Sequence, residues 1–207
     1  MKSIMIINSK GGAGKTTVAV NLASYCALKG FDTTLVDLDP QRSSMQWLKA
    51  RPLSKPLIRG TTNANKPIKK GKNNVVIYDV PAAIYGARLV NYVKKVNSVV
   101  VPVLPSPIDM KAAKDFIQSL RSMGPVIRNK IKVGLVANRC RANTNIFLEL
   151  DDYLLKEKGM KYITALRDNT NYIKSARNGL GIFEMGESAT AQDREEWKPL
   201  VRWLELK

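Results

Sequence analysis

The stretch Ser9-Lys-Gly-Gly-Ala-Gly-Lys-Thr-Thr17 decides the fold. It follows an apolar run over residues 3–8 and precedes a segment with helical periodicity over residues 16–29. Dense glycines let successive backbone N–H groups turn inward toward oxygen atoms, while a lysine reaches phosphates and a hydroxyl can bind Mg²⁺. A helix that starts at this point adds its dipole and favours an anion. The stretch therefore predicts a phosphate-binding loop between a strand and a helix.

The loop departs in one respect from the common phosphate-loop pattern, GxxxxGKS or GxxxxGKT. Gly14-Lys-Thr16 supplies the end of that pattern, but Ser9 stands where the first glycine belongs. Lys10 lies five residues before Lys15, so the loop carries a second lysine. The order of strand, loop and helix still predicts a nucleotide site.

Short apolar runs recur along the chain and predict a sheet. They cover residues 3–8, 33–36, 75–78, 99–103, 133–137 and 162–166, and a further short strand is expected near Leu57 and Ile58. Continuous apolar strands of this kind are buried on both faces. Asp37, Asp79 and Asn138 follow three of the runs directly, and ligands of open α/β sheets bind at that edge.

Segments with helical periodicity alternate with these runs, at residues 16–29, 43–50, 88–95, 110–123, 145–158, 172–178 and 194–206. The alternation predicts an α/β fold, a doubly wound and mostly parallel sheet with helices on both faces. Residues 1–207 are expected to form one domain, because this length suits a single core. Residues 51–74 are rich in Lys, Pro, Gly and Asn and predict an irregular basic connection.

The composition excludes several classes of protein. Hydrophobic residues make up 44% of the 207 residues and charged residues 25%, which is typical of a folded protein. No apolar run is long enough for a membrane-spanning helix or a signal peptide, so a cytoplasmic location is expected. Histidine is absent, which excludes histidine general bases and most zinc sites. Cys26 and Cys140 have no CxxC spacing and are expected to be reduced thiols.

The charge is strongly positive and unevenly distributed. Lys and Arg number 34 against 17 Asp and Glu, a formal net charge of +17. Residues 40–148 hold 20 of the basic residues and three of the acids, whereas the two flanks together hold 14 of each sign. Such a field favours a polyanionic partner, with nucleic acid ahead of an anionic membrane.

Four motifs resemble those of the ParA/MinD ATPases. Lys10-Gly-Gly-x-Gly-Lys-Thr16 resembles their deviant Walker A motif, and Leu35-Val-Asp-Leu-Asp-Pro-Gln41 resembles switch I. Val76-Ile-Tyr-Asp-Val-Pro-Ala82 resembles Walker B and switch II, although it lacks a second glycine-rich turn. Pro102-Val-Leu-Pro-Ser-Pro-Ile-Asp109 resembles the segment after the next strand. The likeness spans nearly the whole chain and is closest to short ParF-type partition ATPases and carboxysome-positioning McdA ATPases.

The resemblance implies that ATP and Mg²⁺ are the cofactors. The phosphates would be held by the side chain of Lys15 and by a run of loop residues, namely Lys10, Gly11, Gly12, Ala13, Gly14, Lys15, Thr16 and Thr17. Thr16 would ligate Mg²⁺ directly, and Asp79 would orient a water on that ion. Asp39, also placed near the metal, would position or activate the attacking water. Asp37 is the alternative, with support of Mg²⁺ or of the loop as its expected role.

Two further roles follow from the same resemblance. Lys10 would reach across a dimer interface to the partner's nucleotide and neutralise charge that develops at the γ-phosphate. Asn138 would contact adenine, and Pro105 and Pro107 would line the same pocket. The residue type and position of Asn138 also fit a simple turn former.

The implied mechanism is an ATP-driven switch with slow, Mg²⁺-dependent hydrolysis. ATP would join two subunits into a homodimer, and this dimer would bind double-stranded DNA of the nucleoid without sequence preference. An adaptor protein linked to a cargo would stimulate hydrolysis and release the dimer. Repeated cycles would position or segregate the cargo, which could be a plasmid, a chromosome locus or a carboxysome.

The DNA contacts have two competing locations. The resemblance points to basic residues of the C-terminal third, namely Arg167, Lys174, Arg177, Lys198 and Arg202. The charge distribution instead points to residues 40–148, which include Lys66, Lys69, Lys70 and Lys72. The first set is the prediction for direct contacts and the second for the long-range field.

Other classes on this scaffold remain as alternatives. A MinD-like membrane-cycling ATPase would need an amphipathic C-terminal helix. Trp197, Leu200, Val201 and Leu204 do form a stripe, but core packing explains it more simply and Pro199 interrupts it. A small-molecule ligase of the same fold would ignore DNA. An iron–sulfur carrier would need clustered cysteines, and a tyrosine kinase would need a tyrosine-rich tail. This sequence has neither feature.

Overall fold

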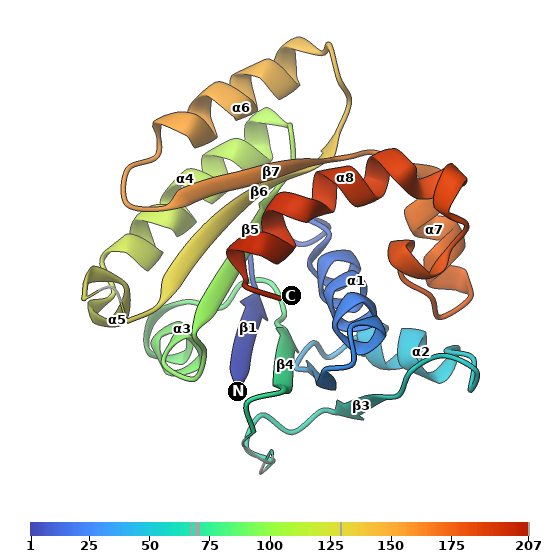
Figure 1. Cartoon of the computed structure of the whole chain (residues 1–207). Coiled ribbons are helices and arrows are strands. Elements are labelled where there is room, and N and C mark those ends of the chain that lie inside the picture. Colours follow the sequence, from blue (N-terminus) through green and yellow to red (C-terminus); the bar gives the residue numbers. More distant parts are fainter. Residues whose placement is uncertain (67, 69–70, 129, 207) are drawn as a thin grey trace.

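One parallel sheet organises the protein in the computed structural model, which describes residues 1–66, 68, 71–128 and 130–206. Within these residues seven strands have the order β3-β2-β4-β1-β5-β6-β7, and all neighbours pair in parallel (Figure 1). The strands are β1 Lys2–Ile6, β2 Asp32–Asp37, β3 Ile58–Thr61, β4 Asn74–Asp79, β5 Ser98–Val103, β6 Lys132–Cys140 and β7 Lys161–Arg167. The predicted α/β fold is confirmed.

Helices cover both faces of this sheet. They are α1 Lys15–Leu28, α2 Ser43–Lys49, α3 Gly86–Val93, α4 Pro107–Arg121, α5 Gly124–Ile127, α6 Asn145–Lys156, α7 Thr170–Arg177 and α8 Glu187–Trp203, with a 3₁₀ turn η1 at Ile182–Glu184. Figure 1 shows α1, α2 and α8 on one side of the sheet and α3, α4 and α6 on the other. The sheet is therefore doubly wound.

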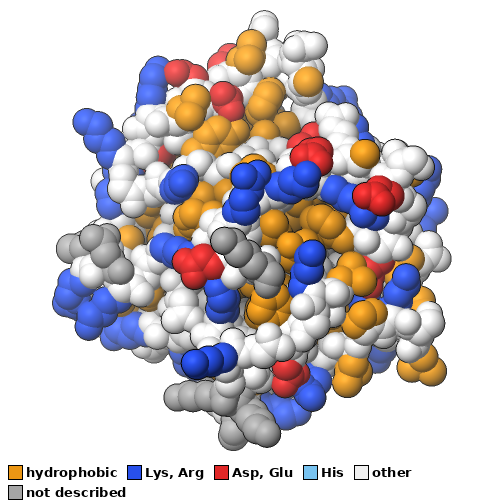
Figure 2. Space-filling view, viewed as in Figure 1, with side chains coloured by type: hydrophobic (Ala, Val, Ile, Leu, Met, Phe, Trp, Pro, Cys, Tyr) orange, Lys and Arg blue, Asp and Glu red, His pale blue; other side chains and the backbone are white. Residues whose placement is uncertain are grey.

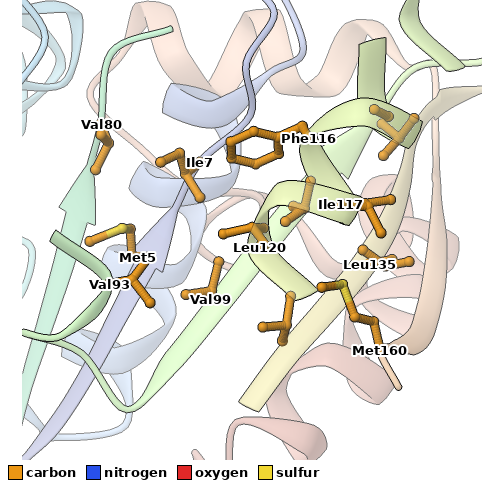
Figure 3. Packing of buried hydrophobic residues seen from close by; sticks show 14 of the residues in the cluster. Met5, Ile7, Val80, Val93, Val99, Phe116, Ile117, Leu120, Leu135 and Met160 are labelled. Carbon is orange, nitrogen blue, oxygen red and sulfur yellow. The ribbon is translucent and has the colours of Figure 1, made fainter. Parts of the chain in front are cut away.

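The central strand β1 shows why its sequence is continuously apolar. Ile4 and Ile6 pack with α1 and α8 in one core cluster. Met5 and Ile7 point to the opposite face and pack against α3 and α4 in a second cluster (Figure 3). Because side chains alternate along a strand and both faces are covered, every one of these four residues is buried.

Helix α8 differs from its prediction at both ends. It begins at Glu187 rather than at residue 194 and ends at Trp203 rather than at residue 206, while Pro199 lies inside it, as in the predicted range. The side chains of Trp197, Leu200 and Val201 around the proline are buried in the core, and this packing outweighs the hydrogen bond that a proline cannot donate. The prediction that core packing explains the apolar stripe is confirmed.

Two other boundaries change the setting of predicted site residues. Strand β6 continues to Cys140, which pairs with Arg167 beyond an irregularity, so Asn138 lies within the strand rather than in a turn. Helix α4 begins at Pro107 rather than at residue 110, because the Ser106 side chain accepts a hydrogen bond from the backbone N–H of Asp109. A proline at the first position suits such a start.

The described residues include no helix long and apolar enough to span a membrane. Cys26 and Cys140 are both buried and free, as predicted. Burial raises the pKa of each thiol to about 12, so both remain protonated and unreactive near neutral pH.

Candidate nucleotide site

The loop between β1 and α1 has the backbone that a phosphate cradle requires. Gly12 and Gly14 adopt positive φ angles of 78° and 85°, and Gly14 is the N-cap of α1. A Cβ atom on Gly14 would lie 2.2 Å from Nδ2 of Asn138, so both conformation and space demand glycine at this position. The N-terminal N–H groups of α1 consequently open toward the loop, where an anion gains from the helix dipole.

Lys15 is held over this loop. Its side chain is buried, and Nζ donates a hydrogen bond to the carbonyl oxygen of Lys10 at 3.0 Å. Burial lowers the pKa of Lys15, while the nearby carboxylates of Asp79 and Asp39 oppose that shift. The structure therefore brings together Lys15, Asp39 and Asp79, three of the residues that the sequence predicted for the site.

The geometry around Asp79 fits a magnesium ion. The hydroxyl of Thr16 donates to Oδ2 of Asp79 at 2.8 Å. Oδ1 of Asp79 and the hydroxyl of Ser44 are buried and have no hydrogen-bond partner among the described residues. Mg²⁺ usually takes one or two protein oxygens and completes its shell with phosphates and water. A hydroxyl and a buried carboxylate oxygen without a partner are the donors that such an ion needs.

The pKa of Asp79 is raised from 3.8 to about 6, mainly by burial; the hydrogen bond from the hydroxyl of Thr16 opposes this shift, and the nearby charge of Asp37 adds to it. The metal-free folded chain thus holds a proton that the unfolded chain loses between pH 4 and 6. The stability of the metal-free protein therefore falls as the pH rises from about 4 to about 6 and levels off above that range.

We expect the metal-free wild-type protein to lose about 3 kcal/mol of unfolding free energy between pH 4 and 8 through Asp79. Asp79→Asn cannot titrate, so it should escape this loss while it weakens binding of Mg²⁺ with nucleotide. Urea unfolding at several pH values in EDTA measures the difference, with Asp115→Asn on an exposed face of α4 as the control. Parallel pH profiles for wild type and Asp79→Asn would contradict the raised pKa of the buried Asp79 carboxyl.

Asp37 and Asp39 have different contacts. The buried carboxylate of Asp37 accepts hydrogen bonds from the backbone N–H groups of Asp39 and Met45, both at 3.0 Å. It therefore ties the end of β2 to the first turn of α2. The carboxylate of Asp39 is only half-buried and accepts from the N–H of Gln41 at 2.9 Å. The contacts of Asp37 support the loop between β2 and α2, whereas the carboxylate of Asp39 is the more exposed of the two.

The segment after β4 contacts the phosphate loop without a second glycine. Ala83 takes the left-handed conformation with φ 57°, and its N–H donates to the carbonyl oxygen of Ser9 at 3.0 Å. Non-glycine residues adopt this conformation at a cost of about 1 kcal/mol. The hydrogen bond links the region that resembles switch II directly to the start of the loop.

A cavity of about 640 Å³ lies beside the loop, past the first turn of α1. Its lining residues are Thr17, Asn138, Arg139, Arg141, Arg167, Asp168, Asn169, Thr170, Tyr172, Ile173, Ala176 and Arg177. Nδ2 of Asn138 donates to the carbonyl oxygen of Ala13 at 2.9 Å, so this side chain joins the cavity to the phosphate loop. Pro105 and Pro107 lie just before α4 and at its start, outside this lining.

The five basic residues predicted to contact DNA have different surroundings. Lys174 and Arg177 are exposed on α7, and Arg177 lines the cavity. The guanidinium of Arg167 is ion-paired with the buried Asp193. Lys198 and Arg202 lie on α8, where Lys198 lines a separate groove beside α1.

Basic side chains are also abundant elsewhere on the surface. Lys and Arg are spread widely across the face in Figure 2. From the middle block, Lys66 and Lys72 are exposed, whereas Lys69 and Lys70 lie outside the described residues.

Sequence reasoning missed several residues of this region. Ser44 carries no motif that marks it, and only burial beside Asp79 reveals it. Arg139 and Arg141 follow Asn138 and line the cavity, so the sequence did contain a signal, two arginines at a strand end. Asp193 lies 55 residues after Asn138 in the chain, and no local pattern connects it to the cavity.

The site lies at the carboxyl edge of a parallel sheet, where a glycine-rich loop and a buried lysine lie beside a hydroxyl–carboxylate pair. This arrangement is that of a P-loop nucleotide-binding protein. The comparison with protein families agrees. Residues 4–182 match the CobQ/CobB/MinD/ParA nucleotide binding domain model, and the chain belongs to that family.

Individual relatives cover most of the chain. Maintenance of carboxysome distribution protein A from Halothiobacillus neapolitanus is 24% identical over 194 residues, 89% of this chain and 88% of that protein. The septum site-determining protein MinD of Pyrococcus horikoshii, solved with Mg-ADP, has a TM-score of 0.66 at 17% identity over 98% of each chain. The ParA of pNOB8, solved on nonspecific DNA, has a TM-score of 0.56 at 17% identity over 76% of each chain. The relatives thus include a protein named for the distribution of carboxysomes, and the similar solved structures include a MinD with Mg-ADP and a ParA on nonspecific DNA.

Proposed function

We propose that this protein is a ParA-type ATPase whose ATP-bound dimer binds DNA without sequence preference and thereby positions a cargo. The observation that carries the proposal is the phosphate loop with two lysines, Lys15 buried over the loop and Lys10 at its outer turn. A relative named for carboxysome distribution and one solved on nonspecific DNA support this reading over a metabolic enzyme.

Different residues of the site would have different roles in hydrolysis. Lys15 and the N–H groups of the loop would bind the β- and γ-phosphates, and the cavity beside Asn138 would take the base and ribose. Thr16 and Asp79 would hold Mg²⁺, which neutralises charge on the phosphates. Asp39, at the opening of the site, would orient the attacking water. A relative solved with Mg-ADP supports the choice of nucleotide and metal.

Lys10 is placed to act outside its own subunit. Its backbone is fixed on both sides, because its N–H donates to Oδ1 of Asn8 at 3.2 Å and its carbonyl accepts from Lys15. Its side chain is only half-buried. A fixed backbone and a partly exposed side chain suit a residue that would reach the nucleotide of a second copy of the chain.

The charge of +17 supports the DNA step. Dimer formation would double the basic surface and so couple DNA affinity to ATP without any base-reading element. Among the C-terminal candidates, Lys174 and Arg177 are the best placed, since they are exposed and close to the nucleotide cavity. A cargo-linked adaptor would then stimulate hydrolysis and release the dimer. The MinD-like alternative requires an amphipathic helix that can contact a membrane, whereas the apolar stripe of α8 is buried in the core.

Co-migration with DNA in ATP, in ADP and without nucleotide, across a salt series, tests the proposal. Wild type should bind only with ATP, and the affinity should fall with a log–log salt slope of about −0.9 per phosphate neutralised. Lys10→Ala should abolish ATP-dependent dimers and DNA binding while ATP still binds to the monomer within about threefold. Lys161→Ala removes the same charge from an exposed strand end and should behave as wild type.

Equal DNA binding in all nucleotide states would reduce the charge to a static patch and contradict the switch. An equal loss of DNA binding in Lys10→Ala and Lys161→Ala would contradict the special role of Lys10. Charge reversal at Arg177 that leaves DNA binding unchanged would exclude α7 as the contact surface.

A further inference from the structure

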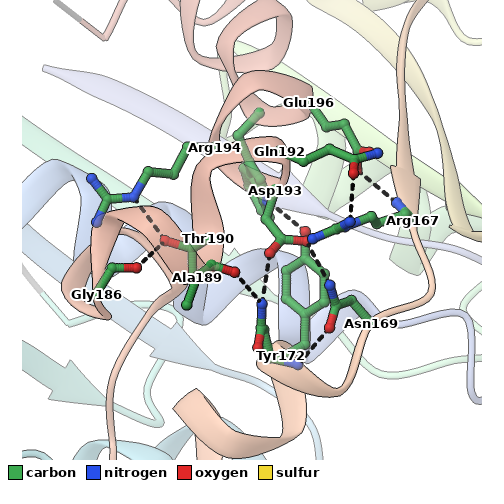
Figure 4. Close-up of polar contacts among 12 residues, drawn as sticks. Arg167, Asn169, Tyr172, Gly186, Ala189, Thr190, Gln192, Asp193, Arg194 and Glu196 are labelled. Atoms are coloured by element: carbon green, nitrogen blue, oxygen red, sulfur yellow. Dashed lines mark hydrogen bonds and ion pairs between the residues drawn. The ribbon is translucent and has the colours of Figure 1, made fainter.

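Asp193 of α8 lies at the centre of a polar network (Figure 4). Its carboxylate is fully buried and accepts three hydrogen bonds. Nε of Arg167 donates to Oδ1 at 2.6 Å, Nδ2 of Asn169 donates to the same oxygen at 3.3 Å, and Nδ2 of Asn171 donates to Oδ2 at 2.9 Å. One buried charge thus binds three polar side chains at alternate positions, from the last residue of β7 to the first turn of α7.

Neighbouring residues of α8 contact the same segment. The backbone N–H of Arg167 donates to Oε2 of Glu196 at 2.8 Å. The indole N–H of Trp197 donates to the hydroxyl of Tyr172 at 2.9 Å. A third contact, from the guanidinium of Arg167 to Oε1 of Gln192 at 2.6 Å, comes from the preceding turn of α8. Helix α8 therefore contacts the junction of β7 and α7 at several points. Among these contacts, Asp193 is the only fully buried acceptor side chain.

The residues at the junction of β7 and α7 also form one wall of the cavity beside the phosphate loop. Of the residues that line this cavity, Arg167, Asn169 and Tyr172 contact α8 directly through these hydrogen bonds. Asp193 itself is not among the lining residues of the cavity. A change at Asp193 therefore reaches a bound ligand only through the position of the wall.

We infer that Asp193 is a positioning residue for the base-binding wall of the nucleotide site, so that α8 sets the contribution of the nucleoside to binding while the phosphate loop binds independently of it. The inference rests on the proposed function, because it requires that the cavity takes the base of ATP. The physical reason is the asymmetry of buried hydrogen bonds: without the carboxylate, Arg167, Asn169 and Asn171 lose their common acceptor and the wall can leave its native position.

Separate affinities for ATP and for inorganic tripolyphosphate, both with Mg²⁺, test the inference. Tripolyphosphate uses the phosphate loop alone, so the ratio of the two dissociation constants isolates the nucleoside. For Asp193→Asn we expect the dissociation constant of ATP to rise about tenfold and that of tripolyphosphate to change less than about twofold. Asn171→Ala removes one donor of the network and should shift the ratio in the same direction, which keeps the test valid if Asp193→Asn folds poorly.

The matched control lies one residue along the same helix. The guanidinium of Arg194 donates to the carbonyl oxygens of Phe183 and Met185, and so anchors α8 to η1 rather than to the cavity wall. Arg194→Gln should lower the melting temperature and leave the ratio as in wild type. An unchanged ratio in both Asp193→Asn and Asn171→Ala, or an equal change in Arg194→Gln, would overturn the inference. If the wild-type protein binds ATP no better than tripolyphosphate, the cavity does not bind the base, and the role of Asp193 is overturned as well. If the protein binds ATP better than tripolyphosphate but shows no ATP-dependent DNA binding, only the proposed function is contradicted.

Discussion

Lys15→Ala is expected to weaken ATP binding about a thousandfold, since removal of one partner from a buried, hydrogen-bonded charge pair costs about 2 to 5 kcal/mol. The amine of Lys15 lies over the loop with Asp39 and Asp79 nearby. Without it, the phosphates would lose the amine that offsets the charge of those two carboxylates. Isothermal titration with ATP and Mg²⁺ measures the loss directly.

Lys10→Ala is the control for this result, because it removes a lysine from the same loop but not the buried one. We expect its affinity for ATP to stay close to that of wild type in dilute, monomeric protein. If Lys15→Ala binds ATP within tenfold of wild type, the loop does not bind phosphate in the manner that its geometry indicates. If both variants lose affinity equally, the two lysines do not have the separate roles assigned to them.

Glu184→Gln is expected to destabilise the fold by about 3 to 5 kcal/mol, because it leaves a buried guanidinium without its counter-charge. The side chains of Arg51 and Glu184 are 5% and 0% exposed, and their atoms meet in two hydrogen bonds of 2.6 and 2.8 Å. Glu184 also accepts from the N–H of Gly181, so it fixes η1 as well as the end of α2. Urea unfolding without nucleotide measures the change.

Lys198→Ala supplies the comparison for an exposed ion pair. Lys198 and Glu195 are paired on α8 with side-chain exposures of 53% and 65%, and loss of such a pair costs about 1 kcal/mol or less. Replacing both Arg51 and Glu184 with apolar residues should recover much of the stability lost in Glu184→Gln. A loss below about 1 kcal/mol in Glu184→Gln would show that the buried pair is not closed in solution.

The sequence was sufficient wherever one segment carries its own pattern. The apolar runs of β1 and β4 and the glycines before α1 predicted the sheet edge, and Lys15, Thr16 and Asp79 meet there as expected. These features are local, since each depends on a few consecutive residues and on the rule that parallel strands end at one edge.

The remaining features depend on contacts between distant segments. The extension of β6 to Cys140 follows from its pairing with β7. The partnership of Asp193 with Arg167 joins residues 26 positions apart. Propensity and periodicity describe neighbours along the chain, so they cannot reveal which distant side chains become partners.

The position of β1 at the middle of the sheet has a consequence for synthesis on the ribosome. Its two neighbours are β4 and β5, which begin at Asn74 and Ser98. Strand β1 is made before both of its neighbours, so its apolar side chains and its two edges lack partners until first β4 and then β5 follow. The phosphate loop, which comes directly after β1 in the chain, takes its working shape only after residues that are made much later pack around it. We accordingly expect nascent chains that stop before β5 to aggregate or to require a chaperone, even though they already contain every residue from Lys10 to Asp79 of the proposed catalytic site.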